Sequence, residues 1–283
     1  MKMQTSLLEQ HETAALSHTP APMLNSPIRW VGGKQRLRKY VLDLLPAHTC
    51  YVEPFCGAAW VLFGKQPKGV EVINDIDNDL INFFRVVKEQ PQALIDSFEW
   101  ELVSRAEFNR LKELDVTKLD SIQRAHRFYY LIMAGWGGEF KYPRFQTAVK
   151  DGASGNRLIN AILTLHERIM PVYKRLQTVI IESMQWADCV DRYDSPTTVF
   201  YIDPPYPMNN CNYVHNMRDM NDHTTLMERL SKSKGRWIVS LYDNTAVRDL
   251  YKRFNFHPIQ SASGMKTGDN KRYINQELLI TNF

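Results

Sequence analysis

The chain has 283 residues, of which 44% are hydrophobic and 23% charged, and its formal net charge at pH 7 is +4. A chain of this length and composition buries one large core, as a single domain or as a domain with a substantial insertion. No apolar run approaches the roughly 18 residues of a membrane span, and residues 1–26 lack the apolar centre of a signal peptide, so we expect a cytoplasmic protein. The mildly basic balance permits a nucleic-acid partner without requiring one.

Cysteines and histidines give no sign of a metal site. The four cysteines form no Cys-x-x-Cys pair, which favours reduced thiols over a disulfide framework or a zinc site. His215 and His223 stand in or just beyond a long loop, and we interpret them as polar loop residues. We therefore expect a protein without a metal.

The N-terminal part divides into a tail and a structured segment. Residues 1–25 are polar, contain two prolines and show no periodicity, which predicts a flexible tail. Ile28 to Lys34 follows, and a helix is predicted from about Gln35 to Leu45, where Pro46 ends it.

The glycine pair before that helix is not part of a phosphate-binding loop. The first glycine of that motif is missing, and the residue after Lys34 is neither Ser nor Thr. Gly32 and Gly33 would let a ligand approach the backbone where a helix begins, and Lys34 would meet an anionic group such as a carboxylate. A simple tight turn is the alternative interpretation.

A nucleotide-type strand–helix–strand unit is predicted next. Tyr51 to Trp60 reads as a strand, a turn containing Gly57 and a helix start, and Val70 to Asp75 reads as a second strand ending in an acid roughly 20 residues further on. Such an acid accepts hydrogen bonds from ribose hydroxyls. The glycines that hold a pyrophosphate are missing, which disfavours NAD or FAD and favours an adenosine ligand without pyrophosphate. Asp75 could equally cap the helix predicted from Ile76 to Gln90.

From about Gln90 to Thr178 the strand–helix alternation stops, which predicts an inserted lobe. Helices are expected near Arg105–Leu114 and Ser121–Met133, and an amphipathic helix is expected from about Asn156 to Arg168. Between them lies a segment of glycines, aromatic residues and basic residues, a mixture that suits contacts with bases and phosphates. A hairpin that packs its own aromatic rings is the alternative. The candidate DNA-binding residues are Trp136, Lys141, Tyr142, Arg144, Lys150 and Arg157.

Alternation resumes after the lobe and completes a doubly wound α/β sheet. The last two strands have no convincing helix between them and are expected to be antiparallel. The expected elements are strands at about 178–182, 199–202, 237–241, 256–259 and 276–281, and helices at about 222–233 and 244–254.

The strand at Val199–Ile202 ends in Asp203-Pro204-Pro205-Tyr206. Pro204 keeps Asp203 out of the helical region, and prolines carry no backbone N–H, so this turn is stiff and presents a carboxylate and carbonyl oxygens beside an aromatic ring. Such a set of acceptors suits a planar amine. A structural strand-end acid is the alternative role of Asp203.

Four motifs occur in a familiar order: Trp30-Val31-Gly32-Gly33-Lys34, Glu53-Pro54-Phe55-Cys56-Gly57, Asn74-Asp75-Ile76-Asp77 and Asp203-Pro204-Pro205-Tyr206. In this order and spacing, from about residue 28 to residue 283, the chain resembles the Dam-like DNA adenine-N6 methyltransferases, the alpha group or D12 class. It departs from the family pattern at Ala59, where a second glycine is common, and at Trp60, where a small residue is frequent.

The resemblance implies a Rossmann-like methyltransferase sheet of seven strands with a reversed C-terminal hairpin. Residues 26–95 and 179–283 would form the catalytic domain and residues 96–178 a mainly helical target-recognition lobe. It also implies S-adenosylmethionine as cofactor and double-stranded DNA as partner, and leaves the oligomeric state open. The implied cofactor-binding residues are Trp30, Gly32, Gly33, Lys34, Glu53, Pro54, Phe55, Cys56, Gly57, Asp75 and Asp203.

The implied reaction uses Asp203, Pro204, Pro205 and Tyr206 as catalytic residues. Asp203 and the Pro204 carbonyl would accept hydrogen bonds from adenine N6 and so localise its lone pair, while Tyr206 would stack on a base flipped out of the duplex. Methyl transfer would then be direct, and gain mainly from positioning. Cytosine-N4 methylation is the nearest alternative chemistry. A catalytically inactive nucleic-acid-binding module is the alternative from another class.

Overall fold

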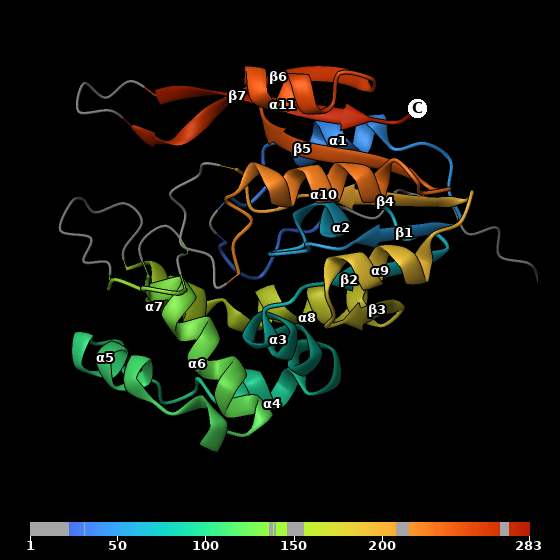
Figure 1. The fold of residues 1–283 in the computed structure, drawn as a ribbon. Helices are drawn as coiled ribbons and strands as arrows, with labels where there is room; N and C mark the ends of the chain where they lie inside the picture. Colours follow the sequence, from blue (N-terminus) through green and yellow to red (C-terminus); the bar gives the residue numbers. More distant parts are fainter. Residues whose placement is uncertain are drawn as a thin grey trace, which may run out of the picture.

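The computed structural model describes residues 23–30, 32–135, 138, 140–145, 156–207, 215–266 and 272–283, with the side chains of 261–266 and 272–275 excepted. A seven-stranded sheet in the order β3-β2-β1-β4-β5-β7-β6 forms its centre (Figure 1). The strands are β1 (Cys50–Glu53), β2 (Val70–Asn74), β3 (Val179–Glu182), β4 (Thr198–Ile202), β5 (Arg236–Tyr242), β6 (Asn255–Lys266) and β7 (Arg272–Thr281).

Strands β1 to β5 are parallel, and β7 runs antiparallel to both β5 and β6. The predicted α/β sheet with a reversed C-terminal hairpin is thereby confirmed. The strand order changes direction between β1 and β4. In open parallel sheets, ligands bind in the crevice at the carboxyl ends of the strands at such a switch point, so the ends of β1 and β4 mark the place to look for a site.

Helices cover both faces of the sheet, and the side chains of β4 alternate between two cores. Val199 and Tyr201 belong to a cluster beneath α1, α2 and α3, whereas Phe200 and Ile202 belong to one beneath α9, α10 and α11. All of β4 is buried because both faces are covered. The covering helices are α1 (Arg38–Leu44), α2 (Trp60–Gly64), α3 (Asn78–Glu89), α9 (Trp186–Tyr193), α10 (Met220–Leu230) and α11 (Thr245–Leu250).

The predicted lobe is helical, as Figure 1 shows in green below the sheet. Its central helix α6 begins with a capping box made by Asp120 and Gln123 and buries one face against α3. Phe128 and Tyr129 of α6 belong to the same core cluster as the sheet residues Val199 and Tyr201. The lobe helices are α4 (Pro91–Asp96), α5 (Arg105–Glu113), a 3₁₀ turn (Val116–Lys118), α6 (Ser121–Ala134), α7 (Arg157–Leu163) and α8 (Leu165–Leu176).

A buried ion cluster fixes the last lobe helix to the sheet. Arg175 of α8 contacts both carboxylate oxygens of Glu71 on β2 at 2.6 and 2.8 Å, and Lys65 reaches the same carboxylate at 2.8 Å. Arg175 also donates to the backbone oxygen of Leu62 in α2 at 3.2 Å. This cluster compensates the buried charges with one another and holds the lobe in place.

Several predicted boundaries were wrong. The helix expected to end near Arg168 is divided at Thr164, and its second part, α8, continues through Pro171 because the burial of Ile169, Val172 and Leu176 outweighs the lost backbone hydrogen bond. Helices α4 and α9 were not predicted, and β6 and β7 are longer than expected. Residues 1–22 of the predicted tail lie outside the described residues, and the predicted division of the domains remains a prediction.

Candidate active site

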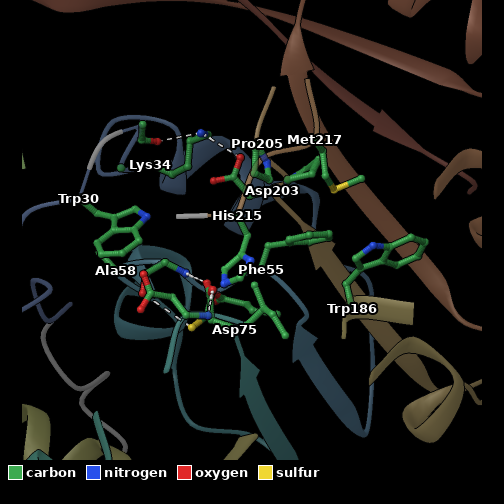
Figure 2. Close-up of a pocket in the computed structure, with 18 of the residues that line it drawn as sticks. Trp30, Lys34, Phe55, Ala58, Asp75, Trp186, Asp203, Pro205, His215 and Met217 are labelled. Carbon is green, nitrogen blue, oxygen red and sulfur yellow. Dashed lines mark hydrogen bonds and ion pairs between the residues drawn. The ribbon is translucent and has the colours of Figure 1, made fainter. Parts of the chain in front are cut away.

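A cavity of about 430 Å³ opens at the carboxyl ends of β1, β2 and β4. Figure 2 shows Trp30 and Trp186 on opposite sides of it, with Lys34 and Asp203 along one edge and Asp75 along another. Of the predicted residues in the described segments, the cavity is lined by Trp30, Gly32, Gly33, Lys34, Glu53, Phe55, Cys56, Gly57, Asp75, Lys141, Asp203, Pro204 and Pro205.

Asp203 directly follows β4 and is held from two sides. Its Oδ1 accepts a hydrogen bond from the Ser240 hydroxyl at 2.7 Å and lies 2.9 Å from Lys34 Nζ. Burial raises the pKa of Asp203, while the ammonium of Lys34 and the bond from Ser240 act in the opposite direction. No hydrogen bond from the described residues reaches Oδ2, which leaves one carboxylate oxygen for a ligand.

Lys34 occupies the centre of this arrangement. Its Nζ donates to the Gly32 carbonyl at 2.8 Å, pairs with Asp203 and lies 4.6 Å from the centre of the Tyr206 ring. The carboxylate that Lys34 meets is therefore that of Asp203. The N-terminal segment and the Asp203 turn, far apart in the sequence, form one unit through this side chain.

The glycine pair forms the tight turn considered from the sequence and also lines the cavity. Gly33 N–H bonds to the Trp30 carbonyl at 3.0 Å, and Gly32 has a positive φ of 71°. A Cβ on Gly33 would lie 2.9 Å from Nε1 of Trp60, so only glycine fits against this indole. The unusual Trp60 thus packs against the turn without closing the cavity.

Tyr206 does not line the cavity. It is 5% exposed, its hydroxyl donates to Glu277 Oε2 at 2.9 Å, and its ring meets that of Tyr242 edge-on at 4.6 Å. The ammonium of Lys34 lies over its ring. Stacking of a base on Tyr206 therefore requires Lys34 to move.

Glu53 ends β1 and is almost fully buried, yet it lines the cavity. Its Oε1 accepts from the Tyr51 hydroxyl at 2.8 Å and from the Leu62 backbone N–H at 2.7 Å. Burial raises the pKa of Glu53 to about 8, although these two hydrogen bonds lower it. No hydrogen bond from the described residues reaches its Oε2.

Asp75 follows β2 and connects the end of this strand to the turn after β1 by hydrogen bonds. Its Oδ2 accepts from the backbone N–H of Gly57 at 3.0 Å and its Oδ1 from that of Asp77 at 3.1 Å. The alternative role of Asp75 as a helix cap was wrong, because Asp77 caps α3 by accepting from Asp79 and Leu80. Burial raises the pKa of Asp75 to about 6, against the opposing effect of its backbone bonds.

The turn after β1 contains two residues with a left-handed backbone conformation. Gly57 has a φ of 46°, and a Cβ there would lie 2.9 Å from the Trp30 ring. Ala59, where the resemblance leads one to expect a second glycine, has a φ of 51° and is the one described residue other than glycine with a positive φ. The backbone here therefore keeps the geometry of a glycine turn at a cost of about 1–2 kcal/mol.

An aromatic wall opposite Trp30 was missed from the sequence. Trp186, at the start of α9, lies with its ring 6.1 Å from that of Phe55 at an interplanar angle of 27°, and both line the cavity with Gln185. Asn74 fixes this wall by bonding to both backbone groups of Met184 and to the Pro54 carbonyl. Trp186 could have been found from the sequence, because it follows closely after the predicted strand at 178–182. The carboxyl end of that parallel strand lies at the same edge of the sheet as those of β1 and β2.

The lobe contributes the remaining wall through Gly138, Phe140 and Lys141. Phe140 packs on Phe128 of α6 at 4.8 Å, Phe145 meets Phe108 of α5 edge-on at 5.3 Å, and Gly135 pairs with Phe145 in an antiparallel bridge. The rings of Phe140 and Phe145 therefore pack on the lobe helices.

The predicted DNA-binding residues fall into three groups. Lys141, Tyr142 and Arg144 are exposed, and Arg157 begins α7 in a half-buried position. Trp136 and Lys150 lie outside the described residues. The lobe therefore combines an aromatic interior with charged and aromatic side chains at its surface.

The two histidines near the Asp203 turn lie in different surroundings. His215 lines the cavity. The interpretation of His223 as a polar loop residue was wrong, because His223 is buried inside α10, where its Nε2 contacts the Met217 carbonyl at 2.9 Å. The described segments bring together no group of three His, Cys, Asp or Glu side chains able to hold a metal ion. Among these same segments, no helix is long and apolar enough to cross a membrane.

Comparison with known proteins agrees with this geometry. Residues 30–265 match the family model of the D12 class N6 adenine-specific DNA methyltransferases. The chain is 25% identical over 277 residues to the Type II methyltransferase M1.LlaDCHI of Lactococcus lactis subsp. cremoris, covering 90% of this chain and 94% of the relative. It is 26% identical over 265 residues to the DNA adenine methylase of Escherichia coli strain K12, covering 89% and 93%.

Two further similarities were found. The DNA adenine methylase of Vibrio cholerae is 28% identical over 242 residues, covering 80% of this chain and 84% of the relative. Among solved structures, a precorrin 8w decarboxylase from Methanobacterium thermoautotrophicum aligns over 93% of this chain and 96% of its own, with 8% identity and a TM-score of 0.39. A structural likeness this low adds nothing to the comparison of function.

Proposed function

The chain belongs to the D12 class of N6 adenine-specific DNA methyltransferases, and from this premise we propose which residues carry out the methylation of adenine in DNA. The observation that carries the proposal is the position of Asp203, whose carboxylate lies at the cavity wall with Oδ2 open to a ligand. The proposed methyl donor is S-adenosylmethionine. We expect the reaction to take place in the cytoplasm.

The residues of the cavity fit this cofactor. Its volume of about 430 Å³ lies within the range of small-molecule sites. Each carboxylate oxygen of Asp75 takes one backbone hydrogen bond and keeps a lone pair for a ribose hydroxyl. Phe55 and Trp186 offer ring surfaces for an adenine, and the open Oε2 of Glu53 suits an ammonium group. When bound, S-adenosylmethionine supplies an electrophilic methyl group on a sulfonium centre.

Asp203 prepares the amine for attack. The lone pair of adenine N6 is delocalised into the ring, and hydrogen bonds from N6 to Asp203 Oδ2 and to the Pro204 carbonyl localise it towards the methyl group. Pro205 keeps the turn stiff, since it has no backbone N–H and a fixed φ. As the new N–C bond forms, N6 becomes positively charged and must lose a proton, which an ionised Asp203 is placed to accept.

Lys34 and Ser240 keep Asp203 ready for this role. Both stabilise the ionised carboxylate against the effect of burial. Lys34 must also leave the face of Tyr206 if the flipped base is to stack there. Base stacking on an aromatic ring is worth about 1–3 kcal/mol and helps to offset the cost of flipping.

We further propose that the lobe binds the DNA duplex through Trp136, Lys141, Tyr142, Arg144, Lys150 and Arg157. Membership of an adenine-specific family favours adenine N6 over the alternative of cytosine N4, and an intact Asp203 turn disfavours an inactive binding module.

Two variants test the division of roles. Asp203→Ala is expected to abolish methyl transfer to DNA while cofactor binding, measured by calorimetry, stays within a few fold of wild type. Asp75→Ala is the matched acidic control and is expected to weaken cofactor binding instead. Retained turnover in the first variant, or unchanged cofactor affinity in the second, would refute the assigned role.

A further inference from the structure

Glu277 is a buried carboxylate close to the Asp203 turn. It lies on β7 opposite Tyr242 of β5, it is almost fully buried, and its Oε2 accepts a hydrogen bond from the Tyr206 hydroxyl at 2.9 Å. Within the part of the chain that the structure describes, no ion pair includes Glu277 and no hydrogen bond reaches its Oε1. A buried charge is costly unless an opposite charge compensates it. A cation would therefore stabilise Glu277.

The Lys34 ammonium and the Glu277 carboxylate contact the same aromatic ring. Lys34 Nζ lies 4.6 Å from the centre of the Tyr206 ring, and Glu277 holds the hydroxyl of that ring. Burial raises the pKa of Glu277, while the positive charge of Lys34 acts in the opposite direction. Because a lysine ammonium stands on a flexible four-carbon stem, a change of rotamer moves it over several ångströms. One ammonium can thus reach two carboxylates, of which it now contacts Asp203 at 2.9 Å.

A base that stacks on Tyr206 takes the place that Lys34 now occupies over the ring. If Lys34 left for solvent, Glu277 would stay buried without a counter-charge. If Lys34 moved along the ring to Glu277, its ammonium would remain paired and the second carboxylate would be compensated. The second movement therefore has the more favourable electrostatic end point.

We propose that Glu277 is a positioning residue that receives the Lys34 ammonium when the target base stacks on Tyr206. This inference rests on the proposed function. Lys34 pairs with Asp203 in the free protein and with Glu277 once the base is in place. Its departure removes a charge that stabilises the ionised form of Asp203, which makes this carboxylate a better acceptor for the N6 proton. Entry of the base and transfer of the proton are thereby coupled.

The first test is Glu277→Gln, which keeps the size of the side chain and an acceptor for the Tyr206 hydroxyl but removes the charge. Single-turnover methylation of plasmid DNA from a host without adenine methylation is measured at saturating DNA and S-adenosylmethionine. The rate is expected to fall by roughly tenfold or more, because Lys34 then keeps its place over the ring and base stacking is lost. Cofactor affinity in calorimetry is expected to stay unchanged. A wild-type rate in this variant would overturn the proposal.

Glu182→Gln is the matched control. Glu182 ends β3, its Oε1 accepts from the Tyr193 hydroxyl at 2.7 Å, and it is not among the residues that line the cavity. This variant changes the same pair of chemical groups and is expected to methylate DNA at the wild-type rate. Since Glu277→Gln removes a buried charge, its melting temperature is expected to equal or exceed that of wild type. A slower rate together with a lower melting temperature would show that Glu277 only supports the fold.

A double variant shows whether Glu277 acts through Lys34. In a Lys34→Met background, Glu277→Gln is expected to change the rate by less than about twofold, because no ammonium remains to be received. An equal loss in both backgrounds would show that Glu277 acts through Tyr206 alone and would overturn the proposal.

A crystal structure of the wild-type protein with duplex DNA and S-adenosylhomocysteine tests the movement directly, even where the double variant is too slow to measure. Beside a base stacked on Tyr206, Lys34 Nζ is expected within hydrogen-bond distance of Glu277. An ammonium that still contacts Asp203 there would overturn the proposal. If wild type does not methylate DNA, the proposed function itself fails. If wild type methylates DNA and Glu277→Gln is equally fast, only the role of Glu277 is refuted.

Discussion

Removal of the Ser240 hydroxyl is expected to shift the pH dependence of methylation. Ser240 is fully buried on β5, and its hydroxyl donates to Asp203 Oδ1 at 2.7 Å and lies 3.2 Å from the Tyr201 hydroxyl. Ser240→Ala removes the donor with almost no change of volume. Asp203 then keeps Lys34 as its partner, and its ionised form is less stable than in wild type.

The magnitude follows from the kind of hydrogen bond that is lost. A hydrogen bond to a charged group contributes about 1.5–3 kcal/mol, and a tenfold change in a protonation equilibrium corresponds to about 1.4 kcal/mol, so the pKa of Asp203 rises and the acid limb of the pH–rate profile is expected to move by roughly one to two pH units. Since N6 needs an ionised acceptor, the rate falls as Asp203 becomes protonated. A raised pKa therefore moves the acid limb of the pH–rate profile to higher pH, while the rate on the alkaline side stays close to wild type.

Single-turnover methylation of DNA, followed across pH with a labelled methyl donor, measures this shift. Thr198→Val is the matched control, because it removes another buried hydroxyl of the sheet, bonded to the Tyr193 carbonyl at 2.7 Å, without touching Asp203. Its acid limb is expected to coincide with that of wild type. An unshifted acid limb in Ser240→Ala, with the rate lowered equally at every pH, would show that the Ser240 hydroxyl does not stabilise the ionised form of Asp203.

Two further predictions concern cofactor binding at Glu53 and the stability of the fold. Because burial raises the pKa of Glu53 to about 8, pairing with a cationic group requires loss of a proton, so cofactor affinity in wild type should tighten from pH 6 to pH 8 and then level off. Glu53→Gln should show no such dependence in calorimetry, and a parallel pH profile would contradict the role. Arg175→Met leaves Glu71 with Lys65 alone and is expected to cost about 3–5 kcal/mol of unfolding free energy in urea titration. A loss below 1 kcal/mol would show that the cluster does not hold the lobe.

The strands of the sheet were predictable because each one is specified by a short stretch of neighbouring residues. The apolar run Val199–Ile202 ends in an acid and two prolines, and Val70–Asp75 ends in an acid, so strands and their carboxyl ends could be placed from short stretches. The reversed hairpin followed from the missing helix before the last strand. Helix ends were less predictable, since α8 passes Pro171 only because tertiary burial outweighs the local preference.

Side-chain contacts between distant parts of the active site could not be predicted from the sequence. Lys34 was expected to meet an anionic group such as a carboxylate, but no local pattern identified that group as Asp203 or placed the same ammonium over the ring of Tyr206. Ser240 and Trp186 belong to no recognisable sequence motif. They reach the edge of the cavity only because β5 pairs in parallel with β4 and β3 pairs in parallel with β2. Such side chains come from strands that are distant in the sequence, and no local sequence pattern predicts the order of these strands in the sheet.

The proposed reaction at Asp203 is methyl transfer to adenine N6 in DNA. Its most direct test is nucleoside analysis of DNA that has been treated with the protein and labelled S-adenosylmethionine, with Asp203→Ala in parallel. All label is expected in N6-methyladenine with wild type and none with the variant. Label in N4-methylcytosine would contradict adenine N6 as the target, and equal label with the variant would contradict the role of Asp203.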